Sequence, residues 1–181
     1  MKKILTSTLV AATLAVSVSA EFVTFEFDTM PYMAGQSTKT VSQAFTLGFK
    51  VNNTLRAGIM QETGTTQLTQ GASNDNADYT ASALNLEYFA YKNVVDAIVG
   101  LNIGTLNTQG AATTVPPASV LAPGAYMMTD IYAKANYSTS KNVFLNLKLG
   151  YRVLPISDTG TASALKDQNA PFLKIGVGVK F

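Results

Sequence analysis

The fold of this chain is decided by its closing stretch, Phe172-Leu-Lys-Ile-Gly-Val-Gly-Val-Lys-Phe181. One face consists of Leu173, Ile175, Val177, Val179 and Phe181, and the other of Phe172, Lys174, Gly176, Gly178 and Lys180. This period of two is strand spacing, because successive Cβ atoms point to opposite sides of a pleated strand. The length also matches the about 9–11 residues with which a tilted strand crosses a bilayer. The stretch therefore predicts a membrane-crossing β-strand.

The first residues have the pattern of a secretory signal peptide. Lys2 and Lys3 precede an apolar stretch from Ile4 to Val16, and small residues follow up to Ala20. As a helix this stretch is too short for a hydrocarbon core of about 30 Å. We therefore expect residues 1–20 to be a cleaved, helical signal peptide and residues 21–181 to form one mature domain.

Composition excludes several classes of protein. Without Lys2 and Lys3, the chain has as many basic as acidic residues, which removes the main support for nucleic-acid binding. It contains no cysteine and no histidine, so it offers no disulfide, no thiolate and no imidazole base or metal ligand. Hydrophobic residues make up 47% and charged residues only 13%, against about 25% charged in ordinary soluble domains. An exported, charge-poor chain without a membrane helix favours a closed barrel.

The alternation of the closing stretch recurs along the chain and predicts eight strands. They cover residues 21–28, 41–51, 55–60, 80–90, 95–104, 127–137, 143–153 and 172–181. Short turns are expected near Asn52, Lys92 and Ser140, and long polar or proline-containing loops at 29–40, 62–79, 105–124 and 154–171. Connections that alternate between long and short are typical of an up-and-down transmembrane β-barrel with all its long loops at one end.

The charged residues set the orientation of the strands. A Lys or Arg facing lipid near the bilayer midplane costs about 2–4 kcal/mol, and a register shift of one residue would turn every charge outward. We therefore expect the charges to form a network in the lumen. The predicted lumen residues are Glu26, Asp28, Lys50, Arg56, Glu87, Asp96, Asp130, Lys134, Lys148, Arg152, Lys174 and Lys180.

Aromatic residues on the opposite, outward face are typical of the girdles found at membrane interfaces. Phe49, Tyr88, Tyr137 and Phe181 would lie near the end with the short turns, and Tyr151 near the other end. The alternative is that aromatic residues simply favour strands.

The leader, the eight alternating strands and the final Val-Lys-Phe181 together resemble the small eight-stranded outer-membrane barrels of Gram-negative bacteria, of the OmpA-transmembrane-domain and OmpX kind. The resemblance implies a location in the bacterial outer membrane and contact with its lipid. It implies that Phe181 belongs to a signal read by the barrel-assembly machinery. Unlike full OmpA, this sequence has nothing after the last strand, so we expect no peptidoglycan-binding domain.

Function is less constrained than fold. One reading is a mostly side-chain-filled lumen and a role in membrane structure and in surface contacts through the loops. The alternative is a small porin-like channel, with room left by glycines such as Gly100 and Gly150. Barrel enzymes of this kind resemble one another in placing a His near a Ser or Asp. Because this chain has no histidine, we expect it not to be an enzyme, and we expect no cofactor.

The polar loops leave two further possibilities open. Asn74, Asp75, Asn76 and Asp78 could supply oxygen ligands to calcium, or Asp75 and Asp78 could act as an acid–base pair, although solvated loop residues are the more ordinary interpretation. Loop 105–124 is the most apolar and could contact a surface ligand or fold over the mouth of the barrel.

Overall fold

A computed structural model describes residues 22–33, 41–70, 73–108, 124–154 and 170–181. The predicted signal peptide lies outside these ranges. Residues 34–40, 71–72, 109–123 and 155–169, which belong to the four predicted long loops, lie outside them too. Of the predicted loop 105–124, only residues 105–108 and 124 are described, so the prediction that this loop could fold over the mouth of the barrel falls on residues outside the described ranges.

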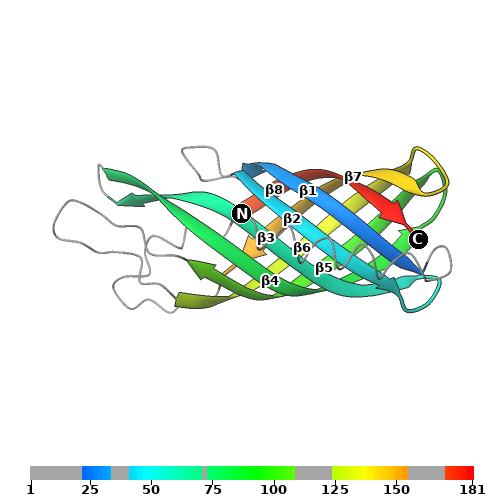
Figure 1. The fold of residues 1–181 in the computed structure, drawn as a ribbon, viewed down its shortest axis with the longest axis horizontal. Coiled ribbons are helices and arrows are strands. Elements are labelled where there is room, and N and C mark those ends of the chain that lie inside the picture. Colours follow the sequence, from blue (N-terminus) through cyan, green and yellow to red (C-terminus); the bar gives the residue numbers. More distant parts are fainter. Residues whose placement is uncertain (1–21, 34–40, 71–72, 109–123, 155–169) are drawn as a thin grey trace.

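The chain forms eight strands in one closed barrel, in which each strand pairs antiparallel with its neighbours in the sequence (Figure 1). The strands are β1 (Val23–Met33), β2 (Val41–Lys50), β3 (Leu55–Gln70), β4 (Ser73–Tyr91), β5 (Val95–Thr108), β6 (Gly124–Ser138), β7 (Val143–Val153) and β8 (Ala170–Lys180). The predicted all-β, eight-stranded up-and-down architecture is confirmed. Among the described residues, no helix is long and apolar enough to span a membrane.

The closing stretch completes the barrel by pairing with the first strand. Thr24 lies opposite Lys180 in the register between β1 and β8. The backbone N–H of Phe181 donates to the carbonyl of Val23, and the N–H of Phe22 donates to the carbonyl of Phe181, both at 2.8 Å. These bonds remove the free edges that an open sheet would expose.

The three short turns lie at one end of the barrel, which we call the short-turn end. The first is fixed by Asn52, whose side-chain oxygen accepts hydrogen bonds from the backbone N–H groups of Thr54 and Leu55, both at 2.8 Å. Asn commonly makes such a bond to the backbone that follows it, which is why it favours tight turns. The opposite end, where the long connections begin, is called the long-connection end.

The predicted loop 62–79 is wrong. Strands β3 and β4 continue through it and remain paired from Leu55↔Tyr88 to Gln70↔Ser73. The outward face becomes polar after Ile59, with Gln61 and Thr63, so the apolar alternation that marks a lipid-facing strand stops although the backbone ladder does not. Figure 1 shows this hairpin projecting beyond the rest of the barrel.

Other predicted boundaries shift in the same direction. Strand β1 continues past Asp28 to Met33, β5 continues to Thr108, and β8 begins at Ala170. Each extension adds residues at the long-connection end.

The two faces of the sheet differ as the charge pattern predicts. Large apolar side chains are exposed on the outer surface, among them Ile59, Leu84, Val99, Ile131 and Leu149. The predicted aromatic residues Phe49, Tyr88, Tyr137 and Tyr151 are exposed there too, and Phe181 is half-buried. Most charged residues within the described strands, among them Glu26, Arg56 and Arg152, are buried on the inner face instead.

Two inward glycines make room for aromatic rings in the lumen. A Cβ on Gly100 would lie 2.2 Å from the ring of Tyr132, and one on Gly178 would lie 2.1 Å from the ring of Phe144. Both rings are buried. These glycines therefore give space to aromatic side chains.

Candidate functional site: the charged barrel interior

The structure brings most of the predicted lumen residues into two groups of ion pairs and leaves three at the short-turn end. Lys50, Asp96 and Lys180 lie at that end, around a pocket described below. The other nine are buried inside the barrel: Glu26, Asp28, Arg56, Glu87, Asp130, Lys134, Lys148, Arg152 and Lys174.

The first group lies nearer the short-turn end, where Arg56 borders the pocket, and we call it the rim-side cluster. It consists of Glu26, Asp28, Arg56, Glu87, Lys134 and Lys148. Glu26 is its centre. Its carboxylate accepts from Arg56 at 2.9 Å, from Lys134 at 2.8 Å and from Lys148 at 3.0 Å. These side chains come from β1, β3, β6 and β7, so the cluster ties together strands from different sides of the barrel.

The remaining carboxylates complete this cluster. Glu87 accepts hydrogen bonds from Arg56, with Nε at 2.9 Å, and from Lys134. Asp28 accepts from Lys148 at 2.6 Å. Three basic groups therefore meet three acidic groups, and the cluster is electrically neutral. Buried charges in such numbers require this matching, because an unpaired charge carries a desolvation cost of several kcal/mol.

The second group, the loop-side cluster, consists of Glu62, Asp130, Arg152 and Lys174. The guanidinium of Arg152 donates to Asp130 at 2.7 and 2.9 Å and to Glu62 at 3.1 and 2.9 Å. Lys174 also pairs with Glu62, at 2.5 Å. Two basic groups meet two acidic groups, and Arg152, Glu62 and Asp130 are all 0% exposed.

Glu62 and its partner Tyr79 are polar interior residues that sequence reasoning missed, since both lie within the predicted loop 62–79. The Tyr79 hydroxyl donates to Glu62 at 2.6 Å. A signal was present, because Glu62 continues the inward series of Arg56, Gly58 and Met60 at steps of two. The polar outward neighbours concealed it.

A chain of polar side chains connects the two clusters. The Tyr132 hydroxyl donates to Glu87 at 2.9 Å and lies 2.6 Å from the amide nitrogen of Asn85. Asn85 also donates to Asn102 at 2.7 Å, and Asn102 reaches Asp130 at 3.4 Å. The hydrogen-bonded network thus extends along the lumen from one cluster to the other.

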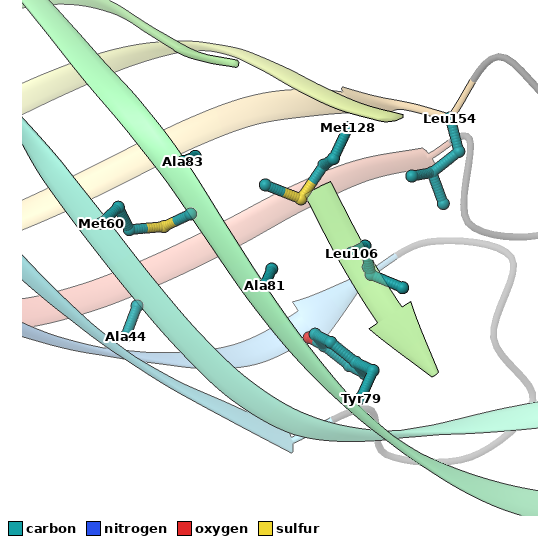
Figure 2. Close-up of a cluster of buried hydrophobic side chains, with 8 residues drawn as sticks. All are labelled: Ala44, Met60, Tyr79, Ala81, Ala83, Leu106, Met128 and Leu154. Carbon is teal, nitrogen blue, oxygen red and sulfur yellow. The ribbon is translucent and has the colours of Figure 1, made fainter. Parts of the chain in front are cut away.

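An apolar layer covers the loop-side cluster toward the long-connection end. Met128 and Leu154 occupy the next inward positions after Asp130 and Arg152, and Leu106 and Tyr79 lie with them in one buried cluster (Figure 2). Phe172, Met30 and Ala170 belong to a second buried cluster, together with Tyr132. The ring of Phe172 lies 5.1 Å from the Lys174 ammonium group, within the range of a cation–π contact.

The residues considered for calcium binding and for acid–base chemistry lie on β4 and not in a loop. Asn74, Asp75 and Asn76 pair along the backbone with Thr69, Leu68 and Gln67, and their side chains lie outside the described residues. Asp78 is exposed and accepts from the Thr65 hydroxyl at 3.0 Å. Within the described part of the chain, no group of three or more Asp or Glu residues is arranged to hold a metal ion.

No family model and no curated protein sequence matches this chain. Solved structures do match it. The outer membrane protein OprG from Pseudomonas aeruginosa is 12% identical with a TM-score of 0.61, covering 90% of this chain and 97% of that one. Neisserial surface protein A is 15% identical with a TM-score of 0.60, covering 88% and 96%.

A third match is the N-terminal β-barrel domain of OprF from Pseudomonas aeruginosa, which is 11% identical with a TM-score of 0.59 and covers 90% of this chain and 100% of that domain. Identities this low show the fold alone. With its closed eight-stranded sheet, apolar exterior and ion-paired interior, the chain has the fold of the small eight-stranded outer-membrane β-barrels.

Proposed function

We propose that this chain is an integral protein of the bacterial outer membrane with a closed lumen, and that it acts in membrane structure and in contacts at the cell surface. The observation that carries the proposal is the set of paired and packed side chains that the described strands place inside the barrel. Two neutral ion-pair clusters, their polar connection and an apolar layer occupy it from β1 round to β8.

The arrangement of charge favours a closed lumen over the porin-like channel. In a conducting pore, charged side chains line water and attract the permeant ion. Here Arg152 has each of its three guanidinium nitrogens bonded to a carboxylate and is 0% exposed. An ion crossing the lumen would have to break these pairs and also displace Met128, Leu106 and Leu154.

The projecting β3–β4 hairpin supports a role in surface contacts. Strand β2 pairs with β3 only as far as Val41↔Thr65, and β5 pairs with β4 only as far as Tyr79↔Thr108. Beyond these points, within the described part of the chain, β3 and β4 pair only with each other. The hairpin thus presents two strand edges at the long-connection end, and such edges are common sites of association.

The proposed role is non-enzymatic. The chain has no histidine, and its buried carboxylates at Glu26, Glu62 and Glu87 are occupied by ion pairs. The remaining expected partner, the barrel-assembly machinery, stays a prediction. In the closed barrel both backbone groups of Phe181 bind to the first strand, so the machinery would read this residue before closure.

The test is electrical recording from planar bilayers that contain the refolded protein, with circular dichroism to establish that it is folded. We expect no reproducible unitary conductance. Reproducible conductance steps in the unchanged protein would overturn the closed lumen and support the channel.

A further inference from the structure

A small basic pocket opens at the short-turn end of the barrel, where Arg56 of the rim-side cluster borders it. Its volume is about 220 Å³, many times the roughly 30 Å³ that one water occupies in the liquid. The pocket is lined by residues of seven strands, of the first and second short turns and of the segment before β1: Phe22, Thr24, Lys50, Asn52, Arg56, Phe89, Lys92, Asp96, Asn136 and Lys180.

The charges around this pocket are not matched, in contrast to those of the two clusters. Lys50, Lys92 and Lys180 line it, whereas Asp96 is its single lining carboxylate. The nearest approach between Lys180 and Asp96 is 3.9 Å, a weak pairing at a site that is partly exposed. Lys92 therefore adds to a local excess of positive charge, which a cavity with low-dielectric walls concentrates.

The cationic groups are held in place by their surroundings. The Lys92 ammonium group lies 4.3 Å from the centre of the Phe89 ring and bonds to the carbonyl of Asn53. The guanidinium of Arg56 lies over the same ring at 5.3 Å. Preorganised cations lose little conformational entropy when an anion binds.

An independent observation points to an occupant. Asn136 lines the pocket and is 1% exposed, yet neither its amide nitrogen nor its amide oxygen has a hydrogen-bond partner. Buried polar atoms are nearly always bonded, and an unbonded one costs free energy that the fold must recover elsewhere. A ligand oxygen in the pocket would accept from this amide nitrogen.

We propose that the pocket binds a phosphate group, with Lys50, Lys92 and Lys180 supplying the positive charge and the Asn136 amide donating from its inner end. Phosphate oxygens make short, charge-assisted hydrogen bonds with lysine, and several such oxygens can engage several ammonium groups at once. The group can come from a free phosphate ion or from the head of a phospholipid at the adjacent membrane surface.

The experiment is an NMR titration of isotope-labelled protein refolded in a maltoside detergent, which contains no phosphate. Inorganic phosphate should shift the side-chain amide signal of Asn136 and the backbone signals of Lys92 saturably. The double variant Lys50→Gln/Lys92→Gln should bind about tenfold more weakly or worse, because two charge-assisted contacts are lost. Lys141→Gln is the matched control, since Lys141 is an exposed lysine of the third short turn that does not line the pocket.

A second variant separates the amide from the charge. Asn136→Leu has nearly the same shape and removes both unbonded atoms, so it should fold at least as stably as the unchanged protein while its phosphate affinity falls. Unchanged affinity in this variant would overturn the assignment of Asn136.

The source of the group is distinguished by a parallel titration with a short-chain phosphatidylglycerol. Tighter binding of this lipid than of inorganic phosphate assigns the pocket to a lipid head, and the reverse order assigns it to a free ion. The proposal fails if neither produces saturable shifts, if chloride produces them with equal affinity, or if Lys141→Gln weakens binding as much as the double variant does.

Discussion

The two ends of the lumen differ in how completely their charged side chains are paired and enclosed. Toward the long-connection end, Arg152 lies between Asp130 and Glu62 under an apolar layer, and all three are 0% exposed. Toward the short-turn end, Arg56 borders a pocket where Lys50 and Lys180 outnumber the acidic partners. Among the described residues, the charges inside the long-connection half of the lumen are therefore matched and enclosed, whereas in the other half the matching ends at a pocket that opens at the short-turn end.

This difference shows what holds buried charge in a barrel. Matched ion pairs contribute little net stability, because desolvation offsets most of their attraction, yet removing one member leaves an enclosed charge without compensation. The penalty depends on whether water can reach the charge that remains. Equivalent deletions in the two halves should therefore have unequal effects on the free energy of unfolding.

The largest effect is expected for Arg152→Met, which leaves Asp130, within the described part of the chain, with its long contact to Asn102 alone. The carboxylate lies beneath Met128 and Leu154, so water cannot replace the lost guanidinium. We expect the free energy of unfolding, measured by urea titration in lipid vesicles, to fall by about 3–5 kcal/mol.

The matched control is the double variant Arg152→Met/Asp130→Leu. It removes one positive and one negative charge together, so Glu62 keeps Lys174 and the cluster stays neutral. We expect it to recover most of the lost stability. If the single variant costs no more than the about 0.5 kcal/mol typical of surface substitutions, the enclosed character of this half is wrong.

A smaller effect is expected for Arg56→Met in the rim-side cluster. After this change Glu26 still has Lys134 and Lys148, and Glu87 still has Lys134 and the Tyr132 hydroxyl. The side chain also borders the open pocket, from which water can enter. We expect a loss of about 1.5–3 kcal/mol in the same urea titration, the usual range for hydrogen bonds to charged groups. A loss equal to or greater than that of Arg152→Met would remove the distinction between the halves.

Sequence reasoning could identify which residues face the lumen but not how they pair. The inward direction of Arg56, Lys134 and Arg152 follows from the cost of placing a charge in lipid. This effect is local, so the pattern of a single strand reveals it. That Arg56 binds Glu26 and Glu87 depends on the stagger of β1, β3 and β4 around the barrel. This stagger is a property of the closed sheet and is not encoded within any one strand.

The strand ends were misjudged for a related reason. The apolar alternation that predicts strands reports where lipid ends, whereas the backbone ladder continues as long as a partner strand is present. At Glu62 these two limits differ, because Gln61 and Thr63 face outward beyond the apolar band while β2 and β4 still pair with β3. The centre of the loop-side cluster therefore fell inside a predicted loop.

The smallest expected effect concerns the protonation of Lys92 at the open end. Partial burial and then the positive charge of Lys50 lower the pKa of Lys92 below its usual value of 10.5. Asp96 on β5 opposes this shift, and Lys180 on β8 and Arg56 on β3 add to it. A bound phosphate would favour the charged ammonium group, so binding should raise this pKa again.

The consequence is proton uptake on binding in the alkaline range below the usual lysine pKa of about 10.4, where a larger fraction of Lys92 than of an ordinary lysine is neutral in the free protein. Phosphate itself stays doubly ionised there and contributes no proton. Calorimetric titrations in two buffers of different ionisation enthalpy should give different apparent heats for the unchanged protein. The difference should shrink in Lys92→Gln, because the group that takes up the proton is gone. Two results would contradict this prediction: proton release in the unchanged protein, or a difference in heat between the two buffers that is as large in Lys92→Gln as in the unchanged protein. Either would show that Lys92 is not the group that becomes protonated when the anion binds.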